Sequence, residues 1–457
     1  MPTPPTAPPG SAPNRLRAVS LAGLTAAALL LALWLLLGAS QPPAWAGGNY
    51  AILQTYPNPS PAPVTDGGEE FGYSLAYLPN SNQLIVGSWS DQVTTTIPGG
   101  LVYLLNATTG AVNHILSRTV PAASDQFGAS VSGVLTAVVV GAPKVDVSGP
   151  SNTNDGAVFL YDATTGALIH FYPHPSAAAN DEFGTAVAII SDTIVVGVPK
   201  YNGSHTDVGR VYLCRMEEGD CPTVVDNPST GAAGDGDKFG LTVVALPGGF
   251  AVGAPVDGSH GTVYVYSFDG AAATLTTVIS TTLTASGDQF GRSLAVVGDK
   301  LLIGAPYDGL DNTGAAYLYD LNGTQLHKFT DPDPHPNDRF GTAVGGDGNL
   351  MVVGSAEDDA GANDSGLISI FDNDSGTDYP FVQSVGPSAP SSGLNFGFAL
   401  TPLNGDFAVS ALKADQGATD AGAVYRVGYQ AVPPTATATA TATAPPNGIF
   451  IPAAHRP

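Results

Sequence analysis

Aspartates are concentrated in two loop segments where their spacing would suit a calcium ion. The first segment contains Asp308 and Asp311, and the second contains Asp358, Asp359 and Asp364. Carboxylate oxygens are ligands that Ca2+ prefers, so these five aspartates are the metal candidates of the sequence. Aspartates also build Asx turns in solvated loops, and this second explanation stays open.

The histidines give no pattern typical of a catalytic site. His114, His170 and His327 occupy equivalent places in outer strands of a repeat described below, where they face different directions, so we expect structural roles. Four others lie in loops without a partner at a catalytic or metal-binding spacing: His174, His205, His260 and His335. The sequence contains neither a nucleophile elbow nor a phosphate-binding loop. We therefore expect no catalytic residues and a protein that is not an enzyme.

The only two cysteines, Cys214 and Cys221, are separated by six residues. A pair so close together favours a local disulfide in an oxidising compartment. A zinc site would need two further ligands, which no neighbouring motif supplies.

Composition limits the class of protein. The chain has 457 residues with 56 Gly, 38 Pro, 39 acidic and 15 basic residues, for a net charge of −24. Few charged residues and many turn residues exclude an all-helical fold, and the scarcity of clustered cations argues against nucleic-acid binding. Residues 47–430 carry all 39 acids against 12 bases. Such a field attracts cations, but it also simply keeps a protein soluble.

Both ends of the chain differ from its middle. Residues 1–46 contain two arginines, an apolar run and a small-residue site ending at Ala46, which predicts a cleaved signal peptide; an uncleaved signal anchor is the alternative. Residues 431–446 are a Pro/Thr/Ala-rich spacer, and residues 447–457 form a short apolar tail that could serve surface sorting or have no role. We expect the protein to be secreted or held at the cell surface, with membrane contact only through these ends.

A repeat fills the segment between them. The dipeptide Phe-Gly recurs at spacings of 50 to 56 residues, and an acid stands two residues before the Phe in six of the seven copies. A Gly-Ala-Pro-like triplet follows 14 to 16 residues later, and then a Gly opens a strand of the Val-Tyr type. The seven repeated phenylalanines are Phe71, Phe127, Phe183, Phe239, Phe290, Phe340 and Phe396.

Each copy is predicted to form four short antiparallel strands. In the second copy these are Gly128–Val134, Ala137–Gly141, Ala157–Asp162 and Ala167–Tyr172, separated by turn residues. Seven such units of about 50 residues are typical of an all-β, seven-bladed β-propeller. We expect each Phe to pack as an apolar wedge between neighbouring sheets.

The sequence also predicts how the ring closes. The last copy ends after its third strand, at Val424–Tyr429, and Tyr50–Tyr56 resembles the end of a fourth strand. The N-terminal strand should therefore complete the last blade, which removes an open sheet edge.

These motifs resemble the FG-GAP repeat of integrin α-subunit propellers and of many secreted bacterial proteins. The resemblance covers about residues 47–430. It implies an extracellular binding module, and in some blades of that family a calcium loop joins the first and second strands. The corresponding connections here, such as Ser132-Gly133 and Ser191-Asp192, lack the alternating oxygen ligands, so that calcium role is not carried over.

We therefore expect a non-catalytic binding or adhesion propeller that presents acidic loops on one face. Its partner would be an extracellular protein or glycan, and the chain would be a monomer with Ca2+ as its only cofactor candidate. Two alternatives remain open: an extracellular propeller enzyme acting on a glycan or small molecule, and a structural envelope protein.

Overall fold

The computed structural model describes residues 48–61, 68–94, 97–147, 153–176, 178–203, 205–229, 235–281, 286–373, 376–416 and 419–431. The predicted signal segment 1–46 and the terminal segments 431–446 and 447–457, apart from Ala431, lie outside the described residues. Among the residues that are described, none belongs to a helix with the length and apolar character needed to cross a membrane.

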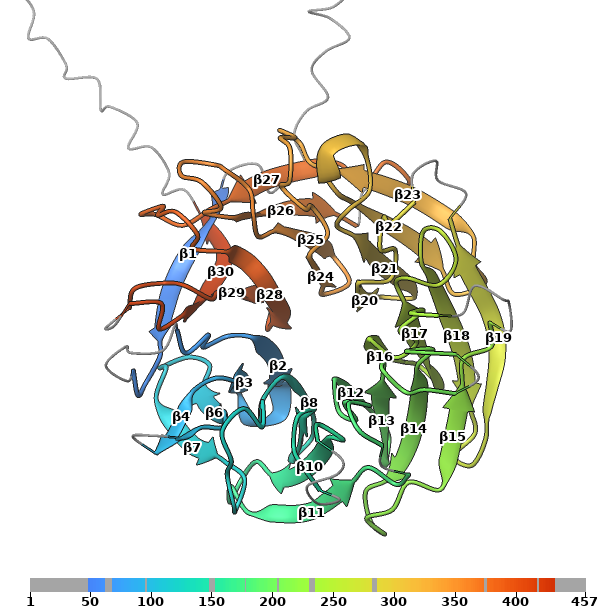
Figure 1. Ribbon diagram of the computed structural model, residues 1–457. Helices are drawn as coiled ribbons and strands as arrows, with labels where there is room; N and C mark the ends of the chain where they lie inside the picture. Colours follow the sequence, from blue (N-terminus) through green and yellow to red (C-terminus); the bar gives the residue numbers. More distant parts are fainter. Residues whose placement is uncertain are drawn as a thin grey trace, which may run out of the picture. The chain divides into compact units, whose positions relative to one another are not determined.

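Seven four-stranded sheets are arranged as a ring, with one edge of every sheet at the centre (Figure 1). Each innermost strand contacts the innermost strands of both neighbouring sheets, including the first with the last. The fold is therefore the predicted all-β, seven-bladed propeller. We number blades 1 to 7 in the order of their innermost strands.

The strands of the seven blades have the following bounds, each set in blade order. The innermost strands are β2 (Ser74–Leu78), β8 (Ser130–Val134), β12 (Ala186–Ile190), β16 (Thr242–Leu246), β20 (Ser293–Val297), β24 (Ala343–Gly346) and β28 (Phe396–Leu403). The second strands are β3 (Gln83–Ser88), β9 (Ala137–Ala142), β13 (Thr193–Val198), β17 (Gly249–Ala254), β21 (Lys300–Ala305), β25 (Leu350–Ser355) and β29 (Asp406–Ala411). The third strands are β6 (Leu101–Asn106), β10 (Ala157–Asp162), β14 (Arg210–Arg215), β18 (Thr262–Phe268), β22 (Ala315–Asp320), β26 (Leu367–Asp372) and β30 (Ala423–Ala431). The outermost strands are β7 (Val112–Leu116), β11 (Leu168–Pro173), β15 (Thr223–Asp226), β19 (Ala273–Ser280), β23 (Gln325–Thr330), β27 (Phe381–Val385) and β1 (Gly48–Pro57).

Burial explains the apolar pattern of these strands. The second strands are covered on both faces by the neighbouring blades; every residue of β13, for example, is buried. Such strands need unbroken apolar runs. The outermost strands alternate between exposed and covered residues, as in β11, because one face meets solvent.

The N-terminal strand closes the ring as the sequence predicts. Strand β1 is the outermost strand of blade 7, hydrogen-bonded to β30, and the two run side by side in Figure 1. Tyr50 and Tyr429 contact each other edge to face at 5.8 Å between ring centroids. The buried Tyr56 hydroxyl also donates to the Ala107 carbonyl of blade 1 at 2.5 Å. The first strand of the propeller, β1, is therefore fixed against its last strand, β30.

The repeated motifs meet at the junctions between blades. All seven repeated phenylalanines are fully buried. Phe183, which begins blade 3, packs among residues of blades 2 and 3, including Leu160 and Val196. Its backbone also forms a parallel bridge with Gly156 of blade 2, and equivalent bridges occur at three other junctions. Each Phe thus fills the wedge between two sheets.

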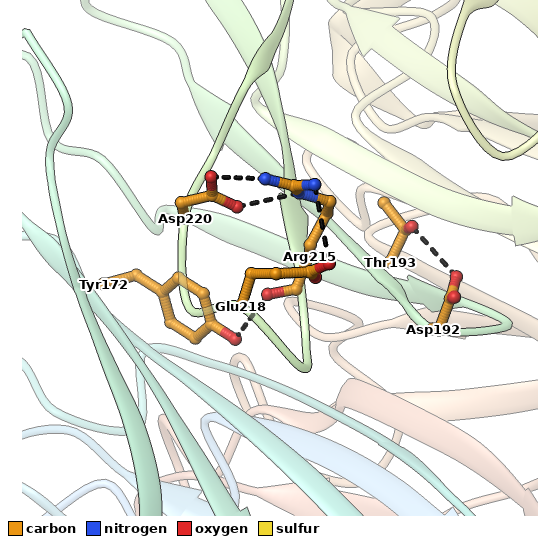
Figure 2. Close-up of polar contacts among 6 residues, drawn as sticks. All are labelled: Tyr172, Asp192, Thr193, Arg215, Glu218 and Asp220. Carbon is orange, nitrogen blue, oxygen red and sulfur yellow. Dashed lines mark hydrogen bonds and ion pairs between the residues drawn. The ribbon is translucent and has the colours of Figure 1, made fainter.

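The predicted disulfide joins Cys214 and Cys221 across the hairpin between β14 and β15. Figure 2 shows the same hairpin: Arg215 forms a two-point contact with Asp220, with Nε to Oδ1 at 2.8 Å. Tyr172 of blade 2 donates to the Arg215 carbonyl at 3.1 Å. This turn is therefore fixed both covalently and by its neighbouring blade.

Candidate functional site

The residue before each repeated Phe has a left-handed backbone in all seven blades, with φ between 52° and 58°. A tight turn at this point lets the chain enter the inner strand while Phe points back into the junction. The seven left-handed residues are Glu70, Gln126, Glu182, Lys238, Gln289, Arg339 and Asn395. Three of them, Glu70, Arg339 and Asn395, line a cavity near the axis.

This cavity of about 410 Å3 lies where the chain enters the innermost strands of blades 1, 5, 6 and 7. We call it the axial mouth. Its lining consists of Glu70, Tyr73, Trp89, Arg292, Pro306, Tyr307, Arg339, Thr342, Ala356, Glu357, Asn395, Phe398, Leu412 and Lys413. Volumes of this order are usual for small-molecule sites.

Aromatic rings form one wall of the axial mouth. The Tyr73 ring contacts Trp89 at 5.5 Å and Phe398 at 5.3 Å between centroids. On another side, the Arg339 guanidinium lies 4.9 Å from the centre of the Tyr307 ring. The Trp89 indole nitrogen donates to the Glu70 carboxylate. These mutual contacts hold the rings in place and leave a mixed aromatic and polar surface.

Three cations line the axial mouth although the propeller as a whole is strongly acidic. Six of the twelve basic residues in 47–430 occupy three repeat positions: the residue before Phe, the second after it, and the third after the first residue of the Gly-Ala-Pro-like triplet. They are Lys144, Lys200, Lys238, Arg292, Arg339 and Lys413. Three glutamates share these positions, and two of them form ion pairs, Lys200–Glu182 at 2.9 Å and Arg339–Glu357 at 2.5 Å. Within the described part of the chain, the other four cations form no salt bridge.

Burial changes the acidity of the groups in the axial mouth. Desolvation raises the pKa of the Glu70 carboxyl, although its Trp89 hydrogen bond and Lys413 oppose the shift. Burial likewise raises the pKa of Glu357 against the effect of Arg339. The pKa of Tyr73 is raised by burial, lowered by Arg292 and raised again by Glu70 and Glu182. Groups from blades 1, 3 and 5 therefore act on one hydroxyl, as expected near the axis.

A second cavity of about 410 Å3 is bounded by the innermost strands themselves. All seven blades contribute to its wall, with residues such as Leu75, Val131, Ile189 and Val244. None of the lining residues is charged. Of these two cavities, only the axial mouth, at the end where the Phe-Gly and Gly-Ala-Pro loops meet, has charged residues in its lining.

Four of the five metal candidates do not come together in one site. Asp308 is buried, where it pairs with Lys328 at 2.8 Å and accepts a hydrogen bond from the Tyr317 hydroxyl. Asp311 is exposed. Asp359 is also exposed and accepts a hydrogen bond from the Asp364 amide at 2.9 Å, which is a contact within its own loop. Calcium binding by these four residues stays a prediction.

The fifth candidate, Asp358, lies in a group of three buried aspartates. One oxygen from each of Asp331, Asp338 and Asp358 lies within 4.8 Å of the others. Sequence reasoning missed the first two. Asp338 is one of the acids that recur two residues before Phe, and Asp331 directly follows the outermost strand of the preceding blade. The two come together only through the packing of blades 5 and 6.

Four of the loop acids that were expected to be exposed are buried. Asp155, Asp257, Asp308 and Asp358 are all buried beneath the face on which acidic loops were expected. Asp155 accepts a hydrogen bond from the Val147 amide at 2.8 Å, and Tyr264 donates to Asp257. Backbone amides and tyrosines stabilise these carboxylates inside the loops, whereas cations occupy the axial end of the same face.

The loop histidines have partners that their sequence spacing does not reveal. Each lies within 4.0 Å of an aspartate, and three of these aspartates are the acid two residues before Phe. The pairs are His174–Asp181 at 3.4 Å, His205–Asp235 at 3.5 Å, His260–Asp288 at 3.1 Å and His335–Asp338 at 3.9 Å. Burial lowers the pKa of His174 to about 4 and raises that of Asp181 to about 6.

The outer-strand histidines contact the next blade. The His114 ring lies 2.9 Å from the Thr164 carbonyl, and a Cβ on Gly219 would be 2.8 Å from the His170 ring. His327 contacts Tyr379 at 5.4 Å between ring centroids. These positions fit the structural role expected from the repeat.

The fold is a seven-bladed propeller with a cavity lined by residues of four blades. A family model of the FG-GAP repeat matches residues 175–214, 282–319 and 324–371, and the seven-bladed architecture is consistent with a propeller of FG-GAP repeats. No curated protein matches the sequence. The repeats and the disulfide both point to an extracellular domain.

Proposed function

We propose that this FG-GAP propeller is an extracellular binding protein whose axial mouth holds an anionic, ring-containing ligand. The observation that carries this proposal is the gathering of Arg292, Arg339 and Lys413 in one aromatic-lined cavity of a chain with net charge −24. Arg339 is paired with Glu357, but Arg292 and Lys413 form no salt bridge among the described residues, and cations without acidic partners favour the binding of negative charge.

The side chains of the axial mouth indicate the chemistry of the ligand. Arginine binds carboxylates in a two-point geometry that lysine cannot reproduce. Trp89, Tyr73 and Tyr307 offer ring faces and edges, which suit a flat or ring-shaped apolar surface. A sugar with a carboxylate, as in a uronic-acid glycan, combines both features. Rigid strands below the loops would keep this surface organised before binding.

Titration calorimetry with a uronic-acid trisaccharide, beside the neutral trisaccharide of the same linkage, tests the proposal. We expect saturable binding of the acidic sugar alone, weakened at least tenfold by Arg292→Ala or Lys413→Ala. Arg215→Ala is the matched control, because it removes a cation from the outer hairpin of blade 3 (Figure 2). Equal binding of the neutral sugar, or no binding at all, would contradict the proposal.

An extracellular enzyme remains the second candidate, favoured by one observation. Glu70 and Glu357 are two carboxyls of the same cavity with pKa values raised by burial, which is the condition of a general acid. Product analysis after incubation with the acidic trisaccharide separates the two roles. If the wild-type protein cleaves the trisaccharide and Glu70→Gln still binds it but no longer cleaves it, the protein is an enzyme.

A further inference from the structure

The seven junctions between blades provide an internal comparison for the group Asp331, Asp338 and Asp358. At six junctions an acid lies two residues before Phe, and each is almost completely buried. A buried carboxylate is costly unless a donor or a positive charge compensates it. The partner of this acid can therefore be compared from one junction to the next.

At three of the six junctions the compensating donor comes from the segment just after the preceding blade's outermost strand. Asn58 donates to Glu69 at 2.6 Å, Arg118 to Asp125 at 2.6 Å, and Asn227 to Asp237 at 3.0 Å. His174 occupies the same strand-end place opposite Asp181. Between blades 5 and 6 the residue at this place is Asp331, so a second carboxylate faces Asp338 where a donor stands elsewhere.

The third aspartate of the group has also lost its usual donor. The acid four residues after the Gly of the triplet accepts a tyrosine hydroxyl in blades 1, 4 and 5, where the pairs are Tyr103–Asp91, Tyr264–Asp257 and Tyr317–Asp308. In blade 6 the acid is Asp358, and the residue at the tyrosine position is Ser369. The Ser369 hydroxyl is engaged with that of Ser384 at 3.0 Å.

The remaining contacts do not neutralise the group. Backbone amides of Asp333 and Ala360 and the Ser355 hydroxyl donate to Asp331 and Asp358. Asp338 is fully buried, and the His335 amide donates to its Oδ2. Its Oδ1 has no hydrogen-bond partner among the described residues, which is also true of Asp237 Oδ1 and Asp288 Oδ1 at other junctions. Among the described residues, no lysine or arginine forms an ion pair with Asp331, Asp338 or Asp358. The His335 ring lies 3.9 Å from Asp338.

We propose that Asp331, Asp338 and Asp358 bind a divalent cation of the Ca2+ type between blades 5 and 6. Two oxygens on opposite sides of a Ca2+ ion at about 2.4 Å would be about 4.8 Å apart. The three carboxylate oxygens lie within 4.8 Å of one another, which is close enough for all of them to contact one ion. An all-oxygen donor set favours hard cations over zinc or copper. The site lies in the loops before the first strand and after the second strand, and it joins two blades.

Calorimetric titration of the EDTA-treated full chain with CaCl2, with MgCl2 in parallel, tests the proposal. We expect one saturable site per chain and a rise of the unfolding temperature on adding Ca2+. Asp331→Asn recreates the donor of Asn58 and Asn227, so this variant should fold and yet lose at least tenfold in affinity. Asp358→Asn should lose affinity as well. Asp288→Asn is the matched control from the neighbouring junction and should keep wild-type affinity.

Two results would overturn the proposal. One is the absence of both heat and thermal shift for the wild-type chain with millimolar Ca2+ or Mg2+, since this measurement needs no variant. The other is Ca2+ binding that survives in both Asp331→Asn and Asp358→Asn, which would place the cation elsewhere. Loss of Ca2+ binding leaves the sugar titration of the axial mouth unaffected, so the two proposals can fail independently.

Discussion

Gly141 of blade 2 and Gly184 of blade 3 are in backbone contact: a Cβ built on Gly141 would lie 2.0 Å from the Gly184 carbonyl oxygen. Gly141 belongs to a Gly-Ala-Pro triplet, and Gly184 belongs to the next Phe-Gly pair. The same contact joins Gly197 to Gly240, and it recurs at other junctions. The two halves of the repeat motif are therefore two sides of one contact between successive blades.

Replacing Gly141 by alanine should destabilise the propeller by about 3 kcal/mol, because the methyl group would force the Gly184 backbone away. Urea unfolding measures the difference. Gly298→Ala is the control: its φ is +64° but no atom lies within 4 Å of the built Cβ, so only backbone strain of about 1 kcal/mol is expected. Equal losses in the two variants would contradict this account.

Deleting residues before Asn58 should expose the edge of β30 and promote self-association, because unpaired strand edges recruit other chains. Size-exclusion chromatography with light scattering measures the mass. The point variant Leu53→Ala changes an exposed side chain of β1 and should behave as the wild type. A monomeric deletion variant of unchanged stability would show that β1 does not close the ring in solution.

Without added metal, the protein should be more stable at pH 5 than at pH 7.5. Burial raises the pKa values of Asp91 and Asp237 to about 6, whereas in the unfolded chain they are ordinary aspartates. The folded state therefore holds more protons between about pH 4 and 6, so stability falls as pH rises through that window. Each group contributes at most about 1.4 kcal/mol per pH unit.

Urea unfolding at several pH values in EDTA measures this slope. Asp237→Asn should reduce the slope, since the amide cannot titrate. The exposed Asp311→Asn serves as the control and should leave it unchanged. Stability that rises steadily from pH 5 to pH 7.5 would refute the assigned sign.

Reducing the Cys214–Cys221 disulfide should cost about 2 kcal/mol, the loop-closure entropy expected for so short a loop. Unfolding with and without dithiothreitol measures the loss. The double variant Cys214→Ala/Cys221→Ala should be insensitive to the reductant. A larger loss than this would mean that the hairpin controls the whole blade, through contacts such as Tyr172 with Arg215.

The strand pattern and the order of the blades could be predicted because both depend on the spacing of motifs along the sequence. The interval between Phe183 and Phe239 sets one blade, and the echo of Tyr172-Pro173 in Tyr56-Pro57 locates the closing strand. The disulfide was also predictable, since two cysteines with only six residues between them in one hairpin have few other partners. All of these features depend on residues that are near in sequence or repeat with a fixed period.

The sites could not be predicted in the same way, because their parts come from different blades. Asp331 and Asp338 meet only when blade 5 packs on blade 6, and Arg292 approaches Tyr73 only because the ring is closed. Neither the burial of Asp358 nor the serine at the position of its tyrosine partner points to a site in the sequence alone, because the repeat does not show which side chains meet at a junction. Residue types and periodicity determine that a seven-bladed propeller forms. Only the closed tertiary structure decides which charges lie together, because electrostatic interactions depend on distance in space rather than along the chain.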